Sequence, residues 1–139
     1  MHELDAVGRA LVAAGYEPRP HFGNLLVVLE RKSLLYTTIE LEISFRKCKY
    51  RLTIRYRRQL RNGNPELRAL TAKANELGLL MANEDYDGHP GYDDDTNSGF
   101  VEWYTYVREG EPLECAISRL KVFADCCFNQ LESAGRIIH

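Results

Sequence analysis

Two stretches of the chain alternate between apolar and polar residues, and this period of two predicts β-strands. In residues 34–45 the apolar positions are the odd-numbered ones from position 39 onward, and in residues 50–56 they are the even-numbered ones. A short polar segment, RKCK, separates the two stretches. We therefore expect an antiparallel hairpin in which both strands bury the same face.

The apolar residues also predict the register of this hairpin, because a single buried face requires the two apolar sets to lie opposite each other. Pairing Phe45 with Tyr50 satisfies this requirement. The register then pairs Ile43 with Leu52, Leu41 with Ile54 and Ile39 with Tyr56 on the apolar face, and Glu40 with Arg55, Ser44 with Arg51 and Thr38 with Arg57 on the polar face.

The polar face of the hairpin carries much of the positive charge, and we expect it to be exposed to solvent. On an exposed face the pair Glu40–Arg55 contributes roughly a few tenths of a kcal/mol. Arg51, Arg57 and Arg58 have no obvious acidic neighbour in this register.

Three further strands are expected, at the apolar run LLVVLE from residue 25, at residues 79–86 and at residues 100–107. The last strand is apolar on both faces, with Phe100, Tyr104 and Tyr106 on one face and Val101, Trp103 and Val107 on the other. Both faces need cover, which indicates either a two-layer core with a bound partner or an aromatic binding surface.

Helical periodicity predicts three helices, at residues 3–15, 64–78 and 112–135. Gly15 and Gly78 suit helix ends, Asn64 and Pro65 suit a helix start, and we expect the last helix to end before Gly135 and the tail RIIH to be loose. The expected apolar faces are Leu4, Val7, Leu11 and Ala14; then Leu67, Leu70, Ala74 and Leu77; and last Leu113, Ile117, Leu120, Ala124, Cys127 and Leu131. The middle face can pack on the sheet or on its own copy across a dimer axis.

These elements predict one α+β domain over residues 1–139, with an antiparallel sheet of about five strands in the order α-βββ-α-ββ-α. The composition, 45% hydrophobic and 27% charged, is that of an ordinary globular domain. No apolar run reaches the roughly 18 residues that a membrane-spanning helix needs, so we expect a cytoplasmic protein without a membrane partner.

The small net charge of −2 hides two opposite blocks of charge. Residues 45–61 hold eight Lys or Arg and no acid, whereas residues 84–95 hold six carboxylates and no base. Such an asymmetry indicates either a surface for a partner or two blocks that face each other in the fold.

The acidic stretch does not match a known metal loop. A calcium loop of the EF-hand kind that starts at Asp93 would place Ser98 where glycine belongs and Tyr104 where the closing glutamate belongs. We therefore interpret the stretch as a solvated connection between strands, with an irregular divalent site as the open alternative. His2, His21, His89 and His139 lack zinc spacing.

No catalytic motif and no cofactor motif occurs in the chain. Of the four cysteines, none is spaced as CxxC and two are adjacent, so we expect buried free thiols, including one at Cys126 within the last helix. The sequence therefore predicts no enzyme, no cofactor and no metal.

The order of elements resembles the type III secretion chaperone-like fold and the related bacterial family of YbjN-like putative sensory transduction regulators. The resemblance covers nearly the whole chain and lies in the strand-forming run at residues 25–56, the capped helix NPELRALTAKANELG, the acidic turn before FVEWYTYV, and the closing helix from Pro112. It implies an α+β homodimer with a non-catalytic role, which holds a segment of another protein.

Two functional hypotheses follow. The first is a protein-binding module, chaperone-like or regulatory, that holds a partner or effector segment, with partner-binding residues Arg51, Arg55, Arg57, Arg58, Tyr104 and Tyr106. The alternative is nucleic-acid binding through the arginine-rich strand at residues 46–61. Against it, Tyr50 and Tyr56 lie on the face opposite most of the arginines, and the sequence pI is near 6.1.

Overall fold

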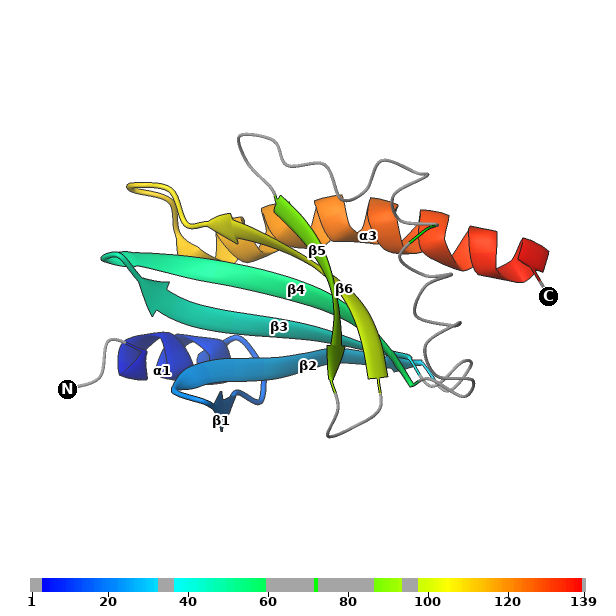
Figure 1. The fold of residues 1–139 in the computed structure, drawn as a ribbon. Helices are drawn as coiled ribbons and strands as arrows, with labels where there is room; N and C mark the ends of the chain where they lie inside the picture. The colour runs from blue at the N-terminus through cyan, green and yellow to red at the C-terminus, as the bar shows by residue number, and fades with distance from the viewer. Residues whose placement is uncertain (1–3, 33–36, 60–71, 73–86, 94–97, 139) are drawn as a thin grey trace.

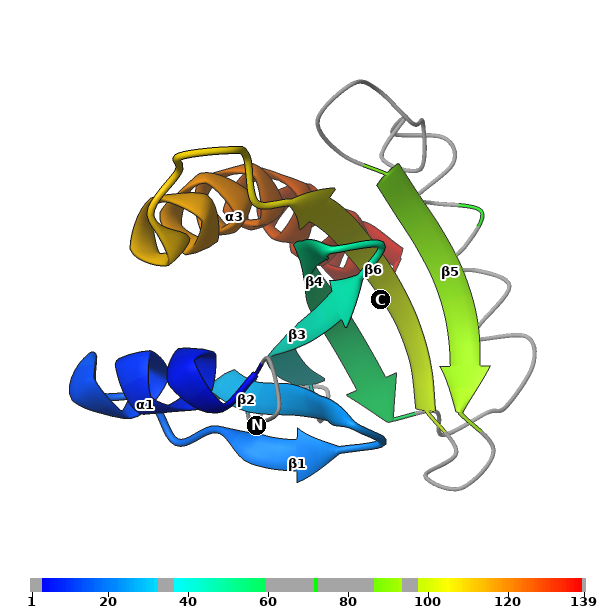
Figure 2. The ribbon, with the colours of Figure 1, turned by 90° about the vertical axis from the view of Figure 1, so that its left-hand side faces the viewer.

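The computed structural model describes residues 4–32, 37–59, 72, 87–93 and 98–138, and its architecture is α+β. All neighbouring strands pair antiparallel in a single sheet of order β1-β2-β3-β4-β6-β5. The elements are α1 (Asp5–Ala13), β1 (Arg19–His21), β2 (Asn24–Lys32), β3 (Thr37–Arg46), β4 (Lys49–Gln59), β5 (Asp87–Asp93), β6 (Ser98–Tyr106) and α3 (Leu113–Ile138). The helices α1 and α3 pack against the same face of the sheet, which is strongly bent (Figures 1 and 2).

The β3–β4 hairpin has the predicted register throughout, from Thr38 opposite Arg57 to Phe45 opposite Tyr50. Its two turn residues, Lys47 and Cys48, both have positive φ, at 51° and 61°. Two consecutive left-handed residues match the right-handed twist of the paired strands, although neither residue is the Asn or Gly that this turn favours.

Residues 19–21 form a short edge strand, β1, that was not among the expected strands. Pro20 makes this strand hard to recognise in the sequence, because proline is rare within strands. An edge strand such as β1 tolerates a proline. The turn to β2 is formed by Phe22 and Gly23, whose φ values are 49° and 80°.

The interpretation of the acidic stretch as a connection is wrong for residues 87–93, which form β5 and pair with β6. Asp, Gly and Pro dominate this segment and normally indicate turns. At the sheet edge, pairing with one neighbour is enough to hold them in a strand. The strand expected at residues 79–86 and, apart from residue 72, the helix expected at residues 64–78 lie outside the described residues.

The N-terminal helix ends as its sequence predicts. Gly15 has a φ of 94°, its N–H donates to the carbonyl of Val12 at 3.0 Å, and the N–H of Tyr16 donates to the carbonyl of Leu11 at 2.9 Å. This pair of bonds is a Schellman motif. The C-terminal prediction is wrong, because α3 continues through Gly135 to Ile138. A single glycine lowers helix stability by about 1 kcal/mol but does not by itself end a helix.

The core lies between the helices and the sheet. Trp103 of β6 is 1% exposed and meets Phe123 of α3 edge to face, with ring centroids 6.4 Å apart. The buried apolar residues are Leu4, Val7, Leu11, Val27, Ile39, Leu41, Ile43, Leu52, Ile54, Tyr56, Val101, Trp103, Ala116, Ile117, Leu120, Ala124 and Cys127. Most of the described residues that were expected on the apolar faces of the helices belong to this core. Ala14 is an exception, because it is exposed.

The thiols differ from the expectation of four buried cysteines. Only Cys127 is buried, whereas Cys48, Cys115 and Cys126 are exposed. Cys126 directly precedes Cys127 on α3, and a step of one residue turns its side chain about 100° away from the buried face.

Candidate binding face of the sheet

The sheet face opposite the two helices carries a cluster of charged and aromatic side chains, which we call the arginine face. Strand alternation and register bring these residues to one side of three adjacent strands. The arginine face consists of Glu40 and Glu42 on β3, Arg51, Arg55 and Arg57 on β4, and Phe100, Glu102, Tyr104 and Tyr106 on β6.

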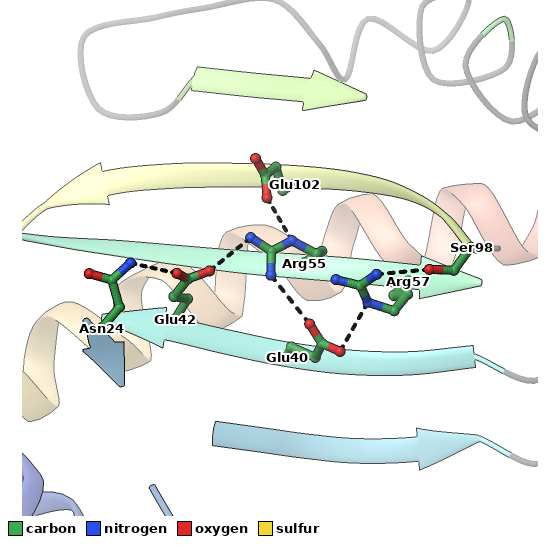
Figure 3. Close-up of polar contacts among 7 residues, drawn as sticks. All are labelled: Asn24, Glu40, Glu42, Arg55, Arg57, Ser98 and Glu102. Atoms are coloured by element: carbon green, nitrogen blue, oxygen red, sulfur yellow. Dashed lines mark hydrogen bonds and ion pairs between the residues drawn. The ribbon is translucent and has the colours of Figure 1, made fainter. Parts of the chain in front are cut away.

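Arg55 lies at the centre of the arginine face and is bound by three carboxylates (Figure 3). Its Nε donates to Glu102 at 2.7 Å, its Nη1 to Glu40 at 3.3 Å and its Nη2 to Glu42 at 3.0 Å. These acids come from the strands on both sides of β4, so a single guanidinium links three strands.

Arg57 and Asn24 extend this network in both directions (Figure 3). Arg57 donates from Nε to Glu40 at 3.1 Å and from Nη1 to the hydroxyl of the buried Ser98 at 2.8 Å. On the other side, the amide of Asn24 donates to Glu42 at 2.7 Å. The network therefore runs from β2 to β6 across four neighbouring strands.

The expectation that this polar face is exposed is wrong at its centre. The side chains of Arg55 and Glu40 are each 11% exposed, and the prediction that Arg57 lacks an acidic neighbour also fails. The strand alternation correctly predicted the side of the sheet on which these residues lie. It does not show that neighbouring strands and aromatic rings cover the guanidiniums. At this depth an ion pair interacts more strongly than at a surface, but it also loses more hydration.

The network keeps the Glu42 carboxylate ionised. Burial alone would raise the pKa of Glu42, but hydrogen bonds from Asn24 and Arg55 and the charge of Arg55 outweigh that effect, so the pKa lies below its ordinary value of 4.5. For Arg55, burial alone would lower the pKa, and the charges and hydrogen bonds of Glu102 and Glu42 raise it instead. Both groups stay charged at neutral pH.

Aromatic rings of β6 cover the arginines. The guanidinium carbons of Arg55 and Arg57 lie 5.2 and 5.4 Å from the centroid of the Phe100 ring, and that of Arg51 lies 5.0 Å from the Tyr104 ring. These distances are typical of cation–π contacts. Tyr104 and Tyr106 meet edge to face, with centroids 6.0 Å apart.

The structure brings five of the six predicted binding residues together. Arg51, Arg55, Arg57, Tyr104 and Tyr106 lie on the arginine face, whereas the alternation of β4 places Arg58 on the face that carries the helices. Tyr50 and Tyr56 lie on the face opposite most of the arginines, as expected, but the tyrosines of β6 share the face of Arg51, Arg55 and Arg57.

Sequence reasoning missed Glu42, Phe100 and Glu102 as partners of the arginines. For Phe100 and Glu102 the missing information was the pairing of β4 with β6, which are separated by 38 positions of the chain, whereas Glu42 lies on β3, diagonally opposite Arg55 in the predicted hairpin. The register Arg55 opposite Glu102 brings opposite charges together, and testing that pairing in the sequence would have indicated it.

A second polar cluster anchors α3 to the sheet. Arg119 donates from Nε and Nη2 to the two carboxylate oxygens of Glu111, at 3.1 and 3.0 Å. It also donates to the hydroxyl of the buried Thr105 at 3.0 Å and to the carbonyl of Tyr106 at 3.2 Å. The Arg119 hydrogen bond and the N–H of Arg108 lower the pKa of Glu111. This cluster positions the end of β6 that carries Tyr106.

Metal ligands and reactive thiols are the remaining candidates for chemistry in the described residues. No group of three His, Cys, Asp or Glu side chains in the described part of the chain could hold a metal ion. The side chains of the acidic stretch from Glu84 to Asp95 lie outside that part, so the alternative of a divalent site there stays open. Burial raises the pKa of the Cys127 thiol to about 11, which keeps it protonated at neutral pH.

Comparisons with known proteins give no relative: no family model, no curated protein and no solved structure matches this chain. None of the helices in the described ranges is long and apolar enough to cross a membrane.

Proposed function

We propose that this protein is a non-catalytic binding module that holds a segment of a partner protein on its arginine face and acts as a homodimer. The observation that carries the proposal is the composition of this face. It combines three half-buried aromatic side chains, Phe100, Tyr104 and Tyr106, with arginines, and neither described helix packs on it. Aromatic residues and arginine are the types enriched at the centres of protein interfaces.

The network of ion pairs and hydrogen bonds on the face supports a binding role. Carboxylates on both sides hold Arg55, and Arg119 holds the end of β6 next to Tyr106. A preorganised surface loses less conformational entropy when a partner binds. The homodimer rests on the resemblance to the chaperone-like fold.

The electrostatics favour binding over acid–base catalysis. A general acid or base works best with a pKa near the working pH. The shifts described above move the pKa of Glu42 down and that of Cys127 up, in both cases away from neutrality.

The nucleic-acid alternative is weakened at the centre of the arginine-rich strand. Arg55 and Arg57 already pair with Glu40, Glu42 and Glu102, so a phosphate would compete with carboxylates that the fold itself supplies. The nucleic-acid alternative is not weakened in this way at the end of β4 near the β3–β4 turn.

The experiment is an affinity capture from host lysate with and without nuclease, using wild type and the double variant Tyr104→Ala/Tyr106→Ala. Charge reversal of Arg55 and Arg57 is unsuitable, because it would break the ion-pair network as well as the surface. We expect a protein partner that survives nuclease treatment and is lost from the double variant, and a light-scattering mass of two chains.

The control is Val122→Ala, at an exposed position of α3, which should retain the partner. Captured material that disappears on nuclease treatment would favour nucleic-acid binding. Capture that is equal for wild type and the tyrosine variant would show that the partner binds elsewhere, and a monomeric mass would contradict the homodimer.

A further inference from the structure

The charge on the arginine face is unevenly distributed along β4. Beyond the network, toward the β3–β4 turn, Ser44 pairs with Arg51 and then Arg46 pairs with Lys49. Because alternate residues of a strand share a face, these three cations lie on the same side as the network. We call Arg46, Lys49 and Arg51 the basic end of the arginine face.

The basic end lacks the acids that neutralise the centre. In the described structure no carboxylate forms an ion pair with any of its three cations, and Arg46 and Lys49 are exposed. The neighbouring turn adds Lys47, which is also exposed. Strands rise about 3.4 Å per residue, so Lys49 and Arg51 are only about 7 Å apart along β4.

Arg51 is held in place but has unused hydrogen-bonding capacity. Its guanidinium lies over the Tyr104 ring, and its Nε is buried without a hydrogen-bond partner. A buried donor without a partner is rare and costs free energy. Of the three guanidinium nitrogens only Nε has this position, so we assign the approach of a ligand to the end of the fork, Nη1 and Nη2.

We propose that the basic end binds a carboxylate of an acidic segment in the partner protein, with Arg51 as the anchoring residue. The proposal rests on the proposed function and names the chemistry of the segment. Two parallel hydrogen bonds from Nη1 and Nη2 match the two oxygens of a carboxylate, and Arg46 and Lys49 add favourable charge. The Tyr104 ring covers one side of the Arg51 guanidinium, and the Tyr106 ring packs against that of Tyr104.

A protein segment fits this place better than a nucleic acid. The three cations occupy a short patch, and the next arginines along β4 on this face, Arg55 and Arg57, are already neutralised. A nucleic-acid backbone is favoured by a longer track of unpaired cations. The centre of the same face shows that carboxylates suit these arginines, since Glu102 meets Arg55 at 2.7 Å.

The test is a titration of the purified protein with fluorescein-labelled hexaglutamate, followed by fluorescence anisotropy at low salt. Hexaglutamine serves as the uncharged probe, and a labelled seven-nucleotide single-stranded DNA of similar charge serves as the nucleic-acid probe. We expect hexaglutamate to bind and the other two probes to bind at least tenfold more weakly. Arg51→Gln should weaken hexaglutamate binding about tenfold or more, the loss of roughly one charge-assisted contact.

The matched control is Arg31→Gln, an exposed arginine on β2, which should leave hexaglutamate binding unchanged. A second readout follows the Nε–Hε signals of arginine in nitrogen-15 spectra, with Arg51 assigned from its variant. Hexaglutamate should shift the Arg51 signal and leave that of Arg55 in place. The shift itself is measured on the wild-type protein, and the variant serves only for the assignment.

Three results would overturn the proposal: hexaglutamate that does not bind, equal binding by wild type and Arg51→Gln, or DNA that binds as tightly as hexaglutamate. These results are separate from failure of the proposed function. A partner captured through Tyr104 and Tyr106 without any affinity for hexaglutamate would keep the binding module and reject only its acidic ligand.

Discussion

Arg51 and Arg55 lie four positions apart on the same strand and the same face, yet their surroundings differ. Arg55 is surrounded by three carboxylates and a phenyl ring, whereas Arg51 has one tyrosine ring and a buried Nε without a partner. The cause lies on both neighbouring strands, because β3 and β6 place Glu40 and Glu102 opposite Arg55 but Ser44 and Tyr106 opposite Arg51. The same residue type therefore stabilises the sheet at one position and is available for binding at the other.

The largest expected effect is on stability. Arg55→Met would leave Glu40, Glu42 and Glu102 partly buried without their shared counterion, so we expect the free energy of unfolding to fall by about 3 kcal/mol. Arg51→Met breaks no ion pair and should cost less than about 1 kcal/mol. Urea unfolding followed by circular dichroism measures both, and similar losses for the two variants would remove the distinction between centre and basic end.

The next effect is on the pH dependence of stability. The pKa of Glu42 is lowered in the folded state, so its carboxylate stabilises the fold fully above the ordinary value of 4.5 and loses that contribution as the pH falls through the lowered pKa. Glu42→Gln should be about 1–2 kcal/mol less stable than wild type at pH 7. The difference should shrink as the pH falls below about 4.5. Urea unfolding of both proteins from pH 7 to pH 3 tests this, and a difference that stays constant would contradict the assignment.

The smallest effect concerns the aromatic rings. A double-mutant cycle of Arg57→Met with Phe100→Leu should give a coupling energy of about 0.5–1 kcal/mol from the cation–π contact. The cycle of Arg51→Met with Tyr104→Leu should give a similar value, because the guanidinium-to-ring distances are 5.4 and 5.0 Å. A coupling near zero in the second cycle alone would mean that Tyr104 does not hold Arg51 in place.

Local patterns predicted the elements that local physics governs. Alternation alone predicted the β3–β4 register to the residue, because a shift by one position would turn Ile43 and Leu52 out of the core. The end of α1 was predictable because Gly15 adopts a φ of 94° without steric strain. Strands β1 and β5 were missed because their prolines and glycines resemble turns, and only the sheet edge makes them strands.

The arginine face was predictable in part. The sequence showed that Arg51, Arg55 and Arg57 share a side of one strand, and that Phe100, Tyr104 and Tyr106 share a side of another. It did not show that these two sides coincide, since β4 and β6 pair across residues 60–97. The cover of Arg55 by Glu102 and Phe100 therefore could not be foreseen, whereas the ion pair of Arg57 with Glu40 is a diagonal contact within the predicted hairpin.

The sequence by itself determined the α+β class, the hairpin register and the residues that enter the core, because periodicity and turn chemistry act between near neighbours along the chain. Only the tertiary structure decided which arginines are neutralised, which one keeps unused hydrogen-bonding capacity and which aromatic rings cover them. The physical reason is that electrostatic and cation–π energies depend on distance in space and on burial. Both are set by the pairing of strands that are far apart in sequence.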